Sequence, residues 1–407
     1  MCGRGITGEK QKTGERTQME GKNHGVMQSE DQSRTEGRKP PAESAHSTRY
    51  FRFDLIRVFA AALIFIFHYN LEGGSACQGS PIRPYGFGNH VNFGPLGVTL
   101  FLLLSGYLAA VSFRRFSARS DQGRVSTAFH WYLHRAWTIY PRYWVCYLVA
   151  ALGSMGVFRH IGKVIILSIV GLDGYALLSG IHAFYYVGEW YIGALIMLYL
   201  MTPFLYRALC RKPRLTMILL VAWYLLFLFF YPRQFWWFAN RANRPATDSD
   251  VLLRVLDFGI GMYIGMYVPK VKTAVLLPCA AAFLFAFFWN VPNAVYPLTG
   301  ELSGVSSFLA FLWLGQIIEK IPGQKVQRFR TVISGLAKYT YTFFLLHHVV
   351  IAGTMQAAGD RMNQPAFYWG CMLWTLFMLT VLTVAIDLGT NAAVSKIQAL
   401  GKRKIDG

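Results

Sequence analysis

Long apolar runs separated by short polar loops make up most of this chain from residue 50 onward. Many of these runs hold about 20 residues, the length that a helix needs to cross the hydrocarbon core of a bilayer. One of eleven such runs, residues 161–181, is broken by Gly171, Asp173 and Gly174, and we interpret it as re-entrant or interfacial. The pattern therefore predicts an all-α polytopic integral membrane protein with about ten transmembrane helices. The predicted spans are residues 53–71, 94–113, 140–158, 187–206, 214–231, 251–268, 272–290, 299–317, 336–353 and 366–390.

Basic residues decide the predicted orientation, because short cytoplasmic loops are enriched in Lys and Arg. If residues 161–181 crossed the membrane, the basic cluster at 207–214 would lie outside. With that segment left out, this cluster and the other basic loops fall on one side. We therefore predict that both termini are cytoplasmic, that residues 50–392 form the transmembrane domain, and that residues 393–407 form a short basic cytoplasmic tail.

Residues 1–49 differ from the rest of the chain. They carry nine Lys or Arg and seven Asp or Glu, without hydrophobic periodicity. Such a composition predicts a disordered cytoplasmic tail. No apolar run follows the start of the chain, so this segment does not resemble a signal peptide.

The composition supports the membrane assignment. Hydrophobic residues make up 54% of the 407 residues and charged residues 15%, which excludes a disordered chain and an ordinary soluble enzyme. The formal charge of +20 could suggest nucleic acid. The cations lie in loops beside apolar runs, however, as orientation signals do, and we expect no nucleic-acid partner. The six cysteines are scattered and indicate no disulfide framework.

Arg57 and His68 both lie inside the first apolar run. Eleven helical steps of ~100° come within about 20° of three whole turns, so both side chains lie on one face, about 16 Å apart along the axis. Ionisable residues inside a membrane helix cost free energy and are often functional. In a structural interpretation, Arg57 pairs with Asp54 to anchor the helix and His68 is a neutral interfacial residue. In a functional interpretation, Arg57 holds an anion near the cytoplasmic face and His68 works three turns higher.

Five segments along the chain form a recognisable series. They are FDLIRVFAAALIFIFH at 53–68, GPLGVTLFLLLSGYL at 94–108, HRAWTIYPRYW at 134–144, WYIGALIMLYLMTP at 190–203 and LAKYTYTFFLLHH at 336–348. In this order and at these intervals they resemble the motifs of the membrane-bound acyltransferase family 3, whose members O-acylate carbohydrates. The resemblance extends over roughly residues 50–390.

The resemblance implies an acyl-CoA donor in the cytoplasm, by family default acetyl-CoA, and a hydroxyl acceptor, usually a sugar, on the far side of the membrane. Arginine suits the phosphates of CoA because the guanidinium can bind bidentately, and the predicted donor-binding residues are Arg57, Arg135 and Arg142. The extended pantetheine arm is about as long as the spacing between Arg57 and His68. His68 is the predicted base for the acceptor hydroxyl, since the unperturbed histidine pKa of ~6.5 suits proton transfer near neutral pH.

Two departures from the family pattern limit this transfer of roles. Thr138 stands where the family often has a second arginine after Arg135, and Arg142 is the candidate substitute. Both arginines are also what the positive-inside rule alone produces. Residues 195–196 are Leu and Ile where many members carry adjacent glutamates, and Glu189 precedes the motif tryptophan instead. The glutamate's role therefore cannot be carried over to it.

The remaining candidates each have two interpretations. His347 aligns with the family's Leu-His position, which implies acceptor binding or stabilisation of charge on the thioester oxygen, although it and His348 could be structural. Ser105 could carry an acyl group or pack a helix, and we favour packing. Trp190 belongs to the outer aromatic belt or stacks on a sugar. We place Trp190, Glu189 and His348 in the acceptor site. No metal is expected, because no further ligands accompany the histidines at a telling spacing.

These features predict an integral membrane O-acyltransferase that acetylates a surface polysaccharide or lipid-linked glycan. The plasma membrane of a bacterium is the expected location, in agreement with the absence of Asn-x-Ser/Thr sequences. The alternative is a secondary transporter or exporter of a small polar or glycan substrate, in which intramembrane Arg, His and Asp bind substrate or relay protons. Transporters tend to show repeat symmetry and paired broken helices, and residues 161–181 alone give that alternative little support.

Overall fold

The computed structural model describes residues 50–76, 86–87, 91–119, 124–153, 165–174, 187–234, 250–288 and 296–405. The chain separates into two units, Met1–Arg49 and Tyr50–Gly407, and the elements below all belong to the second. The predicted tail 1–49 lies outside the described residues. Of the segment 161–181, only residues 165–174 are described.

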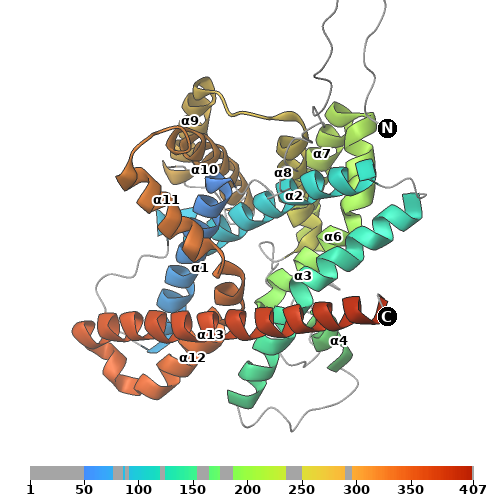
Figure 1. Ribbon diagram of the computed structural model, residues 1–407. Helices are drawn as coiled ribbons and strands as arrows, with labels where there is room; N and C mark the ends of the chain where they lie inside the picture. The colour runs from blue at the N-terminus through green and yellow to red at the C-terminus, as the bar shows by residue number, and fades with distance from the viewer. Residues whose placement is uncertain are drawn as a thin grey trace, which may run out of the picture. The chain divides into compact units, whose positions relative to one another are not determined.

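Helices make up nearly all of the described part of the chain, together with one antiparallel two-stranded ribbon (Figure 1). In chain order the elements are α1 (Phe51–Ala76), β1 (Gly86–Phe87), β2 (Val91–Asn92), α2 (Phe93–Arg119), α3 (Arg124–Gly153), α4 (Ile165–Val170), α6 (Glu189–Arg211), α7 (Pro213–Gln234), α8 (Val251–Tyr267), η3 (Thr273–Val275), α9 (Leu276–Phe288), α10 (Tyr296–Ile318), α11 (Gln324–Ala337), α12 (Thr340–Ala358), η5 (Gly359–Asn363) and α13 (Pro365–Ile405). In the ribbon, Gly86 pairs with Asn92 and Phe87 with Val91.

Each of the ten predicted ranges overlaps a helix of the described residues, but several boundaries differ. Helix α3 begins at Arg124, well before the predicted residue 140, because its first half has a polar surface that hydropathy does not detect. Helix α12 begins at Thr340, and the predicted start at residue 336 falls in α11, which the sequence did not predict as a separate helix. Helix α13 continues through most of the predicted tail 393–407, where Ala, Lys and Gln favour a helix without being apolar enough to span.

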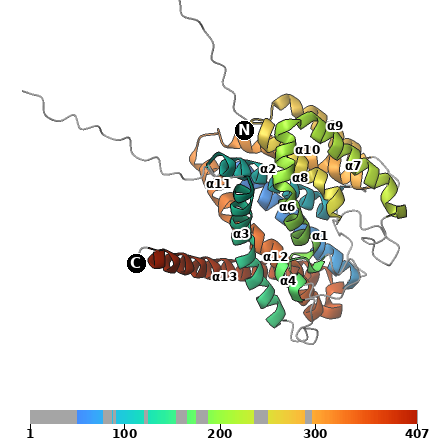
Figure 2. The same cartoon turned by 90° about the vertical axis from the view of Figure 1, so that its right-hand side faces the viewer.

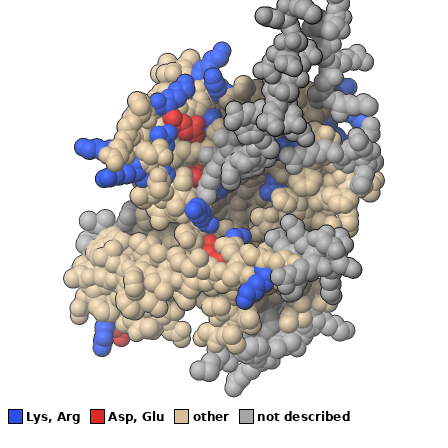
Figure 3. Space-filling view, viewed as in Figure 1, with Lys and Arg blue, Asp and Glu red and all other residues tan. Residues whose placement is uncertain are grey.

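Four helices of the described residues are long and apolar enough to cross a membrane. These segments are Phe93–Ala118, Trp190–Arg211, Pro297–Ile318 and Pro365–Ile397. Two shorter apolar helices, Pro213–Phe229 and Thr273–Phe288, accompany them. On the face shown in Figure 3, Lys and Arg gather around α9 and α11, whereas uncharged residues cover most of α12 and α13. The chain is therefore a multi-pass membrane protein, while the count of ten crossings and the side of each terminus stay predictions.

Helices α2 and α8 pack at unusually close range. A Cβ atom added to Gly106 would lie 2.1 Å from the carbonyl oxygen of Phe258, and one added to Gly261 would lie 2.0 Å from that of Leu103. Only glycine permits this approach of two backbones, and small residues at such interfaces are a common feature of membrane helices. The pair forms the centre against which α1, α6, α7 and α10 are arranged.

Helix α1 connects the two ends of the helical unit. It packs against α2, α10, α11 and α12. Its first turn touches α11, and its C-terminal half reaches α12 and the start of α13 (Figures 1 and 2). Since α1 carries both Arg57 and His68, these contacts fix where the predicted site residues lie.

Candidate active site

Three histidines meet where α1 approaches α12. The ring centroid of His68 lies 5.0 Å from that of His347 and 5.3 Å from that of His348, and the last two rings are 6.3 Å apart. His347 is fully buried. The structure thus brings together one predicted catalytic histidine from the first helix and two candidates from a helix far along the sequence.

Tyrosine contacts fix the position of His68 relative to α13. The hydroxyl of Tyr69 donates to the carbonyl oxygen of Tyr368 at 2.7 Å, and the hydroxyl of Tyr368 donates to Oδ1 of Asn70 at 2.6 Å. Gly73, one turn further along α1, leaves room for the Tyr368 ring, which lies 2.7 Å from where a Cβ would be. These buried hydrogen bonds hold the turn of α1 that carries His68 in one place.

The hydrogen bond of His347 determines which ring nitrogen carries its proton. Nδ1 of His347 lies 2.5 Å from the carbonyl oxygen of Phe344. A carbonyl oxygen only accepts, so Nδ1 must be protonated and the neutral ring presents Nε2 as an acceptor. That Nε2 is buried and makes no hydrogen bond to any described residue. The arrangement favours acceptance of a hydrogen bond from a substrate hydroxyl. Stabilising a thioester oxyanion would require a second proton on the ring.

Glu72 lies beside the histidine cluster, although it was not predicted as a site residue from the sequence. Its Oε1 lies 3.1 Å from Nε2 of His348, and both side chains are about one-third exposed. Glu72 follows His68 by four residues, so the two lie on one face of α1. That spacing was the available signal, and it would have placed a carboxylate one turn beyond the histidine.

Arg57 is paired with Asp54, as the structural interpretation of the first helix requires. Nη1 of Arg57 lies 2.9 Å from Oδ1 of Asp54, which is fully buried, whereas the Arg57 side chain is 28% exposed. The carboxylate orients the guanidinium on the face of α1 that also carries His68. The pairing is compatible with an anchor and with an oriented anion site, and the role of Arg57 in donor binding stays a prediction.

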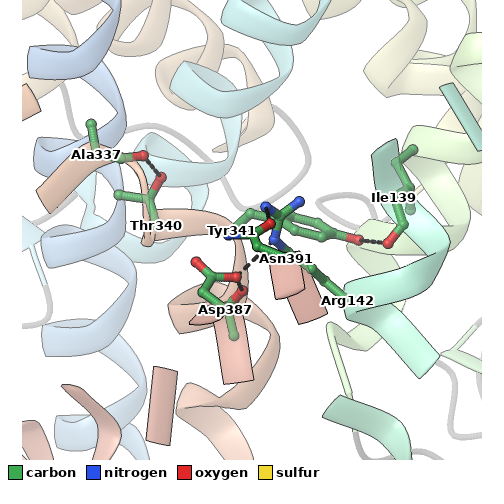
Figure 4. Close-up of polar contacts among 8 residues, drawn as sticks. Ile139, Arg142, Ala337, Thr340, Tyr341, Asp387 and Asn391 are labelled. Atoms are coloured by element: carbon green, nitrogen blue, oxygen red, sulfur yellow. Dashed lines mark hydrogen bonds and ion pairs between the residues drawn. The ribbon is translucent and has the colours of Figure 1, made fainter. Parts of the chain in front are cut away.

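Arg142 belongs to a polar junction of three helices rather than to the histidine cluster. Its Nε lies 2.7 Å from Oδ1 of Asp387, and its Nη2 donates to Oδ1 of Asn391 at 2.8 Å (Figure 4). The hydroxyl of Thr342 donates to the same Asp387 oxygen at 2.6 Å. The junction joins α3, α12 and α13, and it gives Arg142 a structural task that competes with phosphate binding.

Arg135 lies among aromatic rings of α3 and α6. Its guanidinium carbon is 5.2 Å from the ring centroid of Trp131 and 5.3 Å from that of Tyr199, and Nη2 donates to the carbonyl oxygen of Leu108 at 3.3 Å. Cation–π contacts of this kind place the guanidinium over the faces of the aromatic rings. No described contact joins Arg135 to the histidines.

The start of α6 approaches the histidine cluster through aromatic rings. The ring centroid of Tyr191 lies 4.9 Å from that of Phe344, which is 5.3 Å from that of His347. Tyr191 is buried beside these rings, and the choice between packing and acyl transfer for Ser105 stays a prediction. Trp190 is partly buried beside Tyr191. The backbone of Glu189 begins α6, but its side chain lies outside the described set.

A second charged cluster is centred on Arg254 of α8. Nη1 of Arg254 lies 2.9 Å from Oδ2 of Asp257, 3.6 Å from Oε1 of Glu301 and 3.0 Å from the hydroxyl of Thr99. All four side chains are buried. Arg254 and Asp257 lie three residues apart on α8, and Glu301 extends the cluster to α10 and Thr99 extends it to α2.

The described residues contain no group of three or more His, Cys, Asp or Glu side chains suited to hold a metal ion. The expectation that the protein needs no metal stays a prediction.

The comparisons with known proteins agree with the motif series. A family model described as an acyltransferase domain, that of acyltransferase family 3, matches residues 50–387. Neither the curated proteins nor the solved structures contain a match to the chain. The matched region runs from the start of α1 into α13 and includes the three histidines, Arg57, Arg142 and Asp387. The resemblance inferred from the motifs is therefore confirmed at the level of the family: this chain belongs to acyltransferase family 3.

Proposed function

We propose that this protein is an integral membrane O-acetyltransferase. It moves an acetyl group from cytoplasmic acetyl-CoA to a hydroxyl of a glycan on the other side of the membrane. The observation that supports this most is the approach of His68 and His347 to 5.0 Å between ring centroids. Arg57 lies on the same helix, about 16 Å from His68 along the axis.

The donor site lies at the Arg57 end of α1. The phosphates of CoA need cations, and a guanidinium held by a buried carboxylate presents its donors in a fixed direction. Asp54 holds Arg57 in this way through the 2.9 Å ion pair. An extended pantetheine arm then carries the thioester toward His68. Arg135 is the second candidate cation, whereas Arg142 is occupied by Asp387.

The reaction is a direct acyl transfer. His68 removes the proton from the acceptor hydroxyl, and the oxygen forms a bond to the carbonyl carbon of the thioester. The carbon–sulfur bond of the tetrahedral intermediate then breaks. The proton held by His68 passes to the departing sulfur, which leaves an O-acetyl ester and free CoA.

The acceptor is held by hydrogen-bond acceptors beside His68. His347 presents Nε2, because its Nδ1 is committed to the carbonyl oxygen of Phe344. The pair of Glu72 and His348, 3.1 Å apart and partly exposed, offers a carboxylate to sugar hydroxyls. Trp190 supplies an aromatic face on which a sugar ring can stack.

A surface polysaccharide or lipid-linked glycan is the proposed acceptor, and the bacterial plasma membrane is the proposed location. The cytoplasmic side is assigned to the Arg57 end of α1 because the basic segments fall on that side in the predicted topology.

Purified protein in sealed liposomes tests this proposal. Acetyl-CoA labelled in the acetyl group is supplied on one side and a candidate glycan on the other. The expected result is label on the glycan that mild alkali releases, as an O-acetyl ester requires. Glycan that accumulates across the membrane without acetylation would replace the enzyme with the transporter alternative.

A further inference from the structure

Helix α11 has an apolar stripe that the rest of the described structure covers only in part. Phe329, Val332 and Leu336 follow a spacing of i, i+3 and i+7, which places them on one face of the helix. Their side chains are 45%, 60% and 50% exposed. The opposite edge of the apolar face, at Ala337, is buried against the protein. Helix α11 is thus seated on the helical unit and still presents apolar surface outward.

Cations accompany this stripe without acids. The segment from Lys320 to Lys338 contains five Lys or Arg and no Asp or Glu. Lys325 and Arg328 are exposed and each precede a stripe residue by four positions, so they lie beside the stripe. Lys and Arg gather in the same region of the surface in Figure 3.

The stripe is held in place by contacts between α11, α1 and the end of α10. The rings of Phe51 and Phe329 lie 5.8 Å apart. Nη1 of Arg330 donates to the carbonyl oxygen of Glu319 at 3.0 Å, and Nη2 of Arg52 pairs with Oε2 of Glu319 at 3.1 Å. These contacts attach α11 to the turn of α1 that precedes Asp54 and Arg57.

The position of α11 in the chain sets its depth. Helix α10 is long and apolar enough to cross the bilayer up to Ile318, and α11 begins at Gln324. A short basic helix directly after a spanning helix lies at the level of the lipid headgroups. An exposed apolar stripe flanked by Lys and Arg is the surface that interfacial helices use.

We propose that α11 docks on anionic lipid headgroups. Phe329, Val332 and Leu336 enter the boundary of the acyl chains, and Lys325 and Arg328 extend to the lipid phosphates. Anionic lipids attract juxtamembrane cations by about 1 kcal/mol per Lys or Arg. Zwitterionic lipid would satisfy the apolar stripe but not the five cations.

Lipid binding to the purified full-length protein tests the charges. Native mass spectrometry in micelles doped with phosphatidylglycerol or phosphatidylcholine gives the apparent affinity for each lipid. The wild type should prefer phosphatidylglycerol, and the double variant K325Q/R328Q should lose about 30-fold in that affinity. The matched control K270Q/K272Q removes two exposed cations from the α8–η3 turn and should keep it.

Two results would overturn the proposal. One is an equal loss of affinity for phosphatidylglycerol in the test variant K325Q/R328Q and in the control variant K270Q/K272Q. The other is unchanged lipid affinity with weakened acetyl-CoA binding in K325Q/R328Q, which would assign the cations to the phosphates of the donor instead. Because the assay measures lipid binding, its outcome does not depend on whether acetyl transfer occurs.

Spin labels test the apolar stripe. The six native cysteines are replaced by alanine, and a label is attached through Val332→Cys or, as a control, through Gln327→Cys. Helical geometry places Gln327 about 140° from Val332 around the axis, and both side chains are exposed. In liposomes containing phosphatidylglycerol, the label at 332 should collide with oxygen and the label at 327 with a water-soluble nickel chelate. Equal exposure of both labels to the chelate would refute insertion.

Discussion

Replacing Asp387 with alanine should destabilise the protein by about 3 kcal/mol, because one buried oxygen serves two donors. Oδ1 of Asp387 accepts from Nε of Arg142 at 2.7 Å and from the hydroxyl of Thr342 at 2.6 Å. A hydrogen bond to a charged group contributes roughly 1.5–3 kcal/mol, and a buried hydroxyl left without its partner costs about 1–3 kcal/mol. The Arg142 side chain is 27% exposed, so water compensates in part for the hydrogen bond that Arg142 loses. The expected cost therefore lies in the lower part of the range that the two contributions give together.

Two milder variants give the matched series. Asp387→Asn retains an oxygen that accepts from both donors, and it should cost about 1–2 kcal/mol because charge-assisted hydrogen bonds are roughly twice as strong as neutral ones. Asn391→Ala removes only the exposed contact with Nη2 of Arg142 at 2.8 Å. Its expected cost is less than about 1 kcal/mol.

The assay is unfolding by sodium dodecyl sulfate in mild detergent micelles, followed by circular dichroism. The free energy of unfolding should rank wild type, Asn391→Ala, Asp387→Asn and Asp387→Ala in decreasing order. Equal stability of Asp387→Ala and the wild type would refute the reasoning that this junction holds α3, α12 and α13 together. Tighter acetyl-CoA binding by Asp387→Ala would show instead that the released Arg142 is a donor-binding residue.

Two further variants probe the acceptor site and the helix packing. Glu72→Gln removes the negative charge beside His348 while keeping the size of the side chain, so KM for the glycan should rise several-fold and KM for acetyl-CoA should stay unchanged. Steady-state kinetics with each substrate varied in turn measures both KM values. A change in KM for acetyl-CoA alone would contradict the prediction. Gly261→Ala places a Cβ against the backbone oxygen of Leu103 at 2.0 Å and should cost at least about 1–3 kcal/mol. Gly259→Ala, which meets only the flexible end of a leucine side chain at 2.5 Å, should cost less in the same detergent unfolding assay, and equal stabilities of the two variants would refute the close α2–α8 contact.

The helices were predictable because length and hydropathy are local properties. An apolar run of about 20 residues has few alternatives to a helix, and each of the ten predicted spans overlaps a helix of the described residues. Helix α11 was not predicted because its mean hydropathy is low. Its signal was the i, i+3, i+7 spacing of Phe329, Val332 and Leu336, which appears only when the segment is read with helical periodicity.

The site was partly predictable for the same reason. Arg57 and His68 share a helix, so their common face follows from the helical period, and Glu72 could have been found by the same rule. The approach of His347 to His68 depends on how α12 packs on α1, which the spacing of residues cannot give. The partner of Arg142 was likewise out of reach, because Asp387 is 245 residues away along the chain.

The role of His68 as the base is the central claim, and acetyl transfer by the purified His68→Ala variant tests it most directly. Transfer of labelled acetyl to the glycan is measured beside equilibrium binding of acetyl-CoA, with His130→Ala, an exposed histidine of α3, as the control. The account predicts binding close to that of the wild type and a transfer rate lower by about 10²–10⁴-fold, the usual contribution of a general base. Transfer at the wild-type rate by a folded His68→Ala protein that still binds acetyl-CoA would contradict it.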